Sequence, residues 1–69
     1  MNLGERIRER REALGLSQRQ LAERVEVSSP MICWLERGTK SPSLQLGYKL
    51  AEVLEVSVEW LLGISESAV

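Results

Sequence analysis

Apolar residues along this chain recur every three or four positions, the spacing that places them on one face of an α-helix. The first stripe runs through Leu3, Ile7 and Leu14 and ends before Gly15. No stretch alternates apolar and polar residues as a half-buried strand does. The pattern predicts an all-α chain with helices in residues 3–14, 18–25, 29–37, 44–55 and 58–62. The inward positions expected in the second to fourth helices are Leu21, Ala22, Val25, Ile32, Leu35, Leu44, Gly47, Leu50, Ala51 and Leu54.

Each predicted helix follows a residue whose side chain can accept a hydrogen bond from the free N–H groups of a first helical turn. These capping residues are Asn2, Ser17, Ser28, Ser43 and Ser57. Gly15, Gly38 and Gly63 follow predicted helix ends, where glycine readily adopts the left-handed backbone that stops a helix. Pro30 lies in the first turn of its helix, where a missing N–H costs little. The boundaries of all five helices are therefore expected from local sequence.

Length and composition indicate a small folded domain. The 69 residues are 43% hydrophobic and 28% charged, values typical of globular chains. The single cysteine, Cys33, excludes an internal disulfide and fits a reducing compartment. Neither a signal peptide nor an apolar run of membrane-spanning length is apparent. We expect one domain over residues 1–69. We also expect a cytoplasmic protein that is encoded by a bacterium or a phage.

Charge is distributed unevenly along the chain. The net charge of −1 alone counts against binding to nucleic acid. Residues 1–49, however, hold all nine basic residues and six acidic ones, a net charge of +3, whereas residues 50–69 hold four acidic residues and no basic one. The first two thirds of the chain therefore remain a candidate for contact with a polyanion.

The residues that common active sites and metal sites require are missing from the sequence. It contains no histidine, no glycine-rich phosphate loop and no cluster with metal-ligand spacing, and Cys33 has no evident base beside it. We expect no catalytic activity, no metal, no cofactor and no small-molecule ligand.

The second and third predicted helices are separated by Glu26, Val27 and the capping Ser28 alone, so the two helices must turn sharply against each other. Ala22 is small enough to let the third helix cross closely over the second. This geometry predicts a central helix-turn-helix in residues 18–37.

The segments SQRQLAERVEVSSPMICWLERG and KSPSLQLGYKLAEVLEVSVEWLLG resemble the phage lambda repressor and Cro family of helix-turn-helix proteins. The resemblance covers nearly the whole chain and rests on the order and spacing of QxxLA, IxxLERG, SPS and VSVEWLLG. It implies a compact five-helix, lambda-repressor-like fold. It also implies a sequence-specific DNA-binding transcriptional regulator, a repressor that binds a roughly palindromic operator in double-stranded DNA as a homodimer.

The same resemblance implies that residues 29–37 form a recognition helix in the major groove. The positions matching the family's base contacts are Gln18, Ser29, Pro30, Cys33 and Trp34. Because most of these side chains are poor hydrogen-bond partners, apolar contact with thymine methyl groups is the mechanism expected. Alternatively, Gln18 is a solvated residue at a helix start, and Trp34 packs on a neighbouring helix or meets a protein partner.

The family pattern also implies an ion pair between Arg11 and Glu36 that connects the first helix to the third. Phosphate contacts are expected from polar groups around the helix-turn-helix, which provide salt-dependent affinity. The candidates are Arg19, Arg37, Lys40, Ser43 and, if it is exposed, Arg11. For each of them a solvated surface position is the alternative.

Glu26 occupies a position where the family usually has glycine, because the turn needs a left-handed backbone. We expect a turn that is strained or slightly rearranged.

Val56, Val58 and Trp60 are the candidate homodimer contact, because they are more apolar surface than a short last helix needs. The alternative is that Trp60 closes the core. A protein-interaction module with the same fold, an antitoxin and a restriction-modification controller remain alternative functions.

Overall fold

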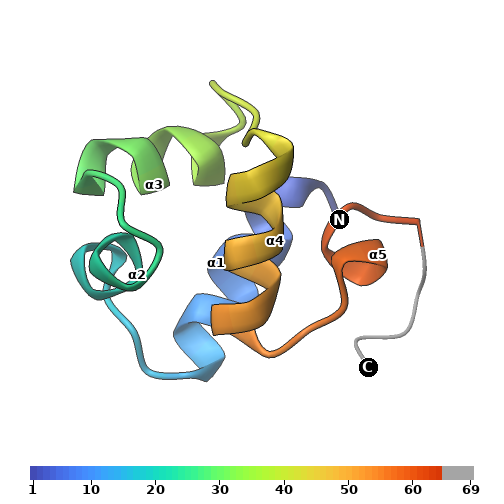
Figure 1. Cartoon of the computed structure of the whole chain (residues 1–69), viewed down its shortest axis with the longest axis horizontal. Coiled ribbons are helices and arrows are strands. Elements are labelled where there is room, and N and C mark those ends of the chain that lie inside the picture. Colours follow the sequence, from blue (N-terminus) through green and yellow to red (C-terminus); the bar gives the residue numbers. More distant parts are fainter. Residues whose placement is uncertain (65–69) are drawn as a thin grey trace.

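The computed structural model describes residues 1–64, and their regular secondary structure consists of five α-helices (Figure 1). The helices are α1 (Leu3–Ala13), α2 (Gln18–Arg24), α3 (Ser29–Arg37), α4 (Leu44–Leu54) and α5 (Val58–Leu61). The all-α prediction is confirmed, and every helix end lies within one residue of its expected position. Residues 65–69 of the expected domain lie outside the described residues. In residues 1–64, no helix combines the length and apolar character needed to cross a membrane.

Side chains cap the start of every helix, as the sequence predicts. Asn2 accepts from the amide of Glu5 at 2.9 Å, and Glu5 accepts in return from the amide of Asn2 at 3.0 Å. Ser17 and Gln20 form the same reciprocal pair at the start of α2. Each cap satisfies donors that the helix itself leaves open, so these helix starts are determined locally.

α1 is the central helix of the fold, because it packs against α3, α4 and α5. In Figure 1, α2 and α3 lie on one side of α1 and α4, and α5 lies on the other side. The core between them contains side chains from every helix. Its fully buried members are Ile7, Leu21, Val25, Ile32, Leu35, Leu50, Leu54 and Leu61.

Leu44 was expected in the core, but its exposed fraction is 71%, so that expectation is wrong. The fully buried Leu50 follows Leu44 by six positions, which places the two side chains about 120° apart around a helix. Leu46 takes the inward position in the first turn of α4 and packs against the core instead. The start of α4 therefore presents Leu44 to solvent.

Two arginines of α1 bind the carboxyl-terminal ends of other helices. Arg6 donates from Nη1 to the carbonyl of Trp60 at 3.0 Å, and Arg10 donates from Nε to the carbonyl of Leu54 at 3.2 Å. The Arg6 guanidinium also lies 5.0 Å from the centre of the Trp60 ring. Helix ends carry unpaired carbonyls and partial negative charge, so these cations hold α4 and α5 onto α1.

Candidate nucleic-acid interface

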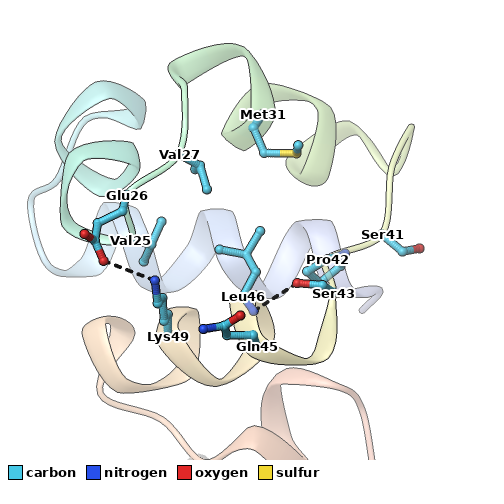
Figure 2. Close-up of a pocket in the computed structure, with 10 residues that line it drawn as sticks. All are labelled: Val25, Glu26, Val27, Met31, Ser41, Pro42, Ser43, Gln45, Leu46 and Lys49. Atoms are coloured by element: carbon cyan, nitrogen blue, oxygen red, sulfur yellow. Dashed lines mark hydrogen bonds and ion pairs between the residues drawn. The ribbon is translucent and has the colours of Figure 1, made fainter.

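The turn between α2 and α3 contains one residue with a left-handed backbone. Glu26 has a φ of 63°, so the turn takes the strained form that a glycine would relieve. The amide of Val27 donates to the carbonyl of Ala22 at 2.9 Å and closes the end of α2. Lys49 Nζ lies 3.1 Å from Glu26 Oε1 and connects the turn to α4 (Figure 2).

Replacing Glu26 with glycine is expected to raise the melting temperature by about 5 °C. The left-handed backbone costs a non-glycine residue roughly 1 kcal/mol, and loss of the exposed ion pair offsets only a few tenths of that. Glu26→Gln is the control, because it removes the charge and keeps the strained backbone. Thermal unfolding followed by circular dichroism measures both variants, and an unchanged or lower melting temperature for Glu26→Gly contradicts the strain.

The outward face of α3 carries four side chains that take no part in the core. Pro30, Cys33, Trp34 and Arg37 follow the i, i+3, i+4, i+7 spacing of one helix face. Pro30, Trp34 and Arg37 are exposed and Cys33 is half-buried, as is Ser29 at the start of the helix. These four side chains form a surface that we call the α3 face, and it contains three of the five expected base-contact residues, with Ser29 next to it in the chain.

Arg11 and Glu36 form an ion pair between α1 and α3. Arg11 Nε lies 2.6 Å from Glu36 Oε2, and the two side chains are 12% and 5% exposed. Arg11 also donates from Nη1 to the carbonyl of Leu16 at 2.9 Å. The hydrogen bond to Glu36 raises the pKa of Arg11 above its usual value. The Arg11 side chain is therefore largely enclosed, and its donors bind Glu36 and the carbonyl of Leu16. Arg11 was expected to contact phosphate only if it was exposed, so this arrangement does not favour that contact.

Gln18, the first residue of α2, is connected to the same ion pair. Its Nε2 donates to Glu36 Oε1 at 3.1 Å, which leaves its side-chain carbonyl and one amide N–H available. Gln18 also lies in a shallow depression between α1, α2 and α3. The depression is lined by Arg8, Arg11, Gln18, Cys33, Glu36 and Arg37. The structure thus brings Gln18, Cys33 and Arg37 together, and it adds Arg8, which the sequence analysis had assigned no role.

The remaining phosphate candidates lie at four places between the start of α2 and the start of α4. Arg19, at the start of α2, has an 82% exposed side chain and approaches Glu23 to 3.8 Å. Arg37 is exposed at the end of α3, and Lys40 is exposed in the connection to α4. Ser43 is exposed and caps α4, where its side chain accepts from the amide of Leu46. Arg37 thus belongs to the α3 face itself, and Arg19, Lys40 and Ser43 lie before and after it along the chain.

The family model described as Helix-turn-helix matches residues 7–61, which include the whole of α2 and α3. The chain belongs to this helix-turn-helix family. An HTH-type transcriptional regulator of Methanothermobacter thermautotrophicus is 52% identical over 48 residues, 70% of either chain.

Solved structures of helix-turn-helix proteins superpose on most of the chain. The P22 c2 repressor in complex with a synthetic operator has a TM-score of 0.90 and 34% identity over 94% of this chain and 98% of its own. A restriction-modification controller protein from Aeromonas hydrophila has a TM-score of 0.81 and 37% identity over 87% and 91% of the two chains. The expected lambda-repressor-like fold is confirmed, and the chain is a helix-turn-helix transcriptional regulator with a repressor-like DNA-binding fold.

In this helix-turn-helix fold Trp60, a residue of α5, is only 9% exposed and closes the core. That is the alternative the sequence left open for Trp60, and the side chain offers little surface to a second chain. Val56 and Val58 are half-buried in the connection into α5 and the start of α5. They line a shallow depression together with Tyr48, whose exposed fraction is 58%.

A groove of mixed polar and apolar lining between the turn, α3 and the start of α4 was missed by the sequence analysis. Met31 and Leu46 point into it from opposite sides, and Val27 lies at its edge near the turn (Figure 2). The three residues belong to separate helices or to the turn, so no local pattern indicates that they meet. The groove adjoins the first turn of α3.

Proposed function

We propose that this helix-turn-helix regulator is a repressor that binds a roughly palindromic operator as a homodimer. The observation that carries the proposal is the α3 face, because Pro30, Cys33, Trp34 and Arg37 lie together on the outside of the helix and serve no core. An α-helix fits the major groove, and a helix-turn-helix presents the N-terminal part of its second helix to base edges.

Base readout is assigned to Gln18 and to the first half of α3. The free carbonyl and amide N–H of Gln18 suit the paired acceptor and donor that adenine presents in the major groove. Ser29 can hydrogen-bond to either kind of base edge, whereas Pro30 and Cys33 offer apolar contact to thymine methyl groups. The ion pair of Glu36 holds the Gln18 amide in place before DNA arrives, which lowers the entropy cost of binding.

Phosphate binding is assigned to Arg19, Arg37, Lys40 and the capped start of α4 at Ser43. These groups contact the backbone on either side of the groove and determine how residues 18–37 dock. Val56 and Val58 support the homodimer, because each is only half covered within one chain and lies beside the exposed Tyr48. A symmetric pair of chains would explain a two-fold operator.

Selection of bound duplexes from a random pool, followed by titration with salt, tests the proposal. We expect a palindromic motif with half-sites about one helical turn, roughly 10 base pairs, apart. With Arg19, Arg37 and Lys40 from each of two chains, log K should fall with log salt at a slope of about −5. The absence of both an enriched motif and salt-dependent binding contradicts the proposal and favours a protein-interaction module.

A further inference from the structure

Lys40 lies over the ring of Trp34, with its Nζ 4.5 Å from the ring centre. The backbone supports this contact, because the amides of Thr39 and Lys40 donate to the carbonyl of Trp34 at 2.9 and 3.4 Å. The chain leaving α3 therefore folds back over the last turn of the helix. Trp34 is 37% exposed, so the ring and the ammonium group meet at the surface, on the α3 face.

The two lysines of the chain differ in what holds their ammonium groups. Lys49 pairs with Glu26 at 3.1 Å, whereas Lys40 has no ion pair with any carboxylate among residues 1–64 and contacts the aromatic ring instead. A ring attracts a cation without neutralising it, so the full charge stays available to an incoming anion. The contact also restricts a flexible four-carbon side chain before binding.

We propose that Trp34 is a positioning residue that holds Lys40 ready for a DNA phosphate, rather than a residue that reads a base. The inference rests on the proposed function and deepens it. The ammonium group covers one face of the ring, and that face is therefore unavailable to thymine methyl groups. Through Lys40, the uncharged Trp34 side chain thus contributes to the part of the affinity that depends on salt and not on DNA sequence.

Two quantities separate positioning from base readout. A positioning residue affects binding to every duplex equally and changes the salt slope, because it acts through a charge. A base-reading residue changes the ratio between the operator and an unrelated duplex and leaves the salt slope alone. Both quantities come from the same titrations.

The experiment measures Kd on the selected operator and on a scrambled duplex over a range of salt. The proteins are the wild type, Trp34→Ala, Trp34→Phe, Lys40→Met and the double variant Trp34→Ala with Lys40→Met. We expect Trp34→Ala to weaken binding to both duplexes by a similar factor, about fivefold, and to make the salt slope shallower, as Lys40→Met does. Trp34→Phe should retain most of the affinity because it keeps an aromatic face. In the Lys40→Met background, Trp34→Ala should have little further effect.

A loss of operator preference with an unchanged salt slope in Trp34→Ala overturns the inference, as do additive effects in the double variant. The wild-type titration distinguishes this failure from failure of the proposed function, which appears as an absence of salt-dependent binding before any substitution. The contact itself is tested without DNA by NMR. The ring should shift the Lys40 ε-methylene protons upfield in the wild type, and Trp34→Ala should abolish that shift.

Discussion

Replacing Glu36 with glutamine is expected to lower the free energy of unfolding by about 3–5 kcal/mol, because the enclosed Arg11 then keeps only the exposed Glu12 carboxylate, 3.9 Å away, as a charged neighbour. The Glu36 and Arg11 side chains are 5% and 12% exposed, so water cannot substitute fully for the lost carboxylate. A chain of this length is stable by only about 3–10 kcal/mol, so the variant should lose a large part of its stability. Urea denaturation followed by circular dichroism measures the change.

Glu12→Gln is the matched control for Glu36→Gln. Glu12 also approaches arginine, at 3.4 Å from Arg8 and 3.9 Å from Arg11, but its side chain is 57% exposed, so its loss should cost well under about 1 kcal/mol. A double variant, Arg11→Met with Glu36→Leu, should recover most of the stability, because apolar residues remove both buried charges together. The argument fails if Glu36→Gln costs no more than Glu12→Gln.

Replacing Gly4 with alanine should destabilise the fold by about 3 kcal/mol, at the upper end of overpacking effects. A Cβ on Gly4 would overlap the carbonyl oxygen of Glu36 and lie 2.7 Å from that of Leu35. Both atoms belong to the backbone of α3 and cannot rotate away as a side chain can. α1 and α3 would have to separate at the point where the ion pair of Arg11 and Glu36 joins them.

Gly47→Ala is the control for Gly4→Ala, because it makes the same chemical change within a helix. An added Cβ on Gly47 meets nothing within 4 Å, so alanine should raise stability by about 0.5–1 kcal/mol through its better helix propensity. Urea denaturation of both variants compares the two sites under one condition. A shift of the same sign in both contradicts the close approach of α1 and α3.

Local chemistry made most of the fold predictable from the sequence. A helix start depends on a capping side chain within three residues, so Asn2, Ser17 and Ser28 each indicate a boundary without reference to the rest of the chain. The strained turn at Glu26 was predictable from the family resemblance, because the family usually has glycine at this position. These effects act over one turn of helix.

Features that depend on which helices meet were not predictable in the same way. No local pattern assigns a role to Arg6 and Arg10, which donate to carbonyls more than 40 residues away. Glu55 has a φ of 61° and ends α4 one residue earlier than expected, with no glycine to indicate it. No sequence pattern indicates a role for Gly4, because its role is to let the backbone of α3 pack closely against α1.

The amino-acid sequence alone predicts the five helices of residues 1–64, the residue at which each begins, and the helix-turn-helix that two of them form. Caps, stripes and turn residues are short-range, and a few neighbouring residues suffice to specify them. The packing of the helices, in contrast, places Trp60 in the core, Glu36 against both Arg11 and Gln18, and Lys40 on Trp34. Each of these depends on the angle and distance at which separate elements pack, and residue types alone do not encode that geometry.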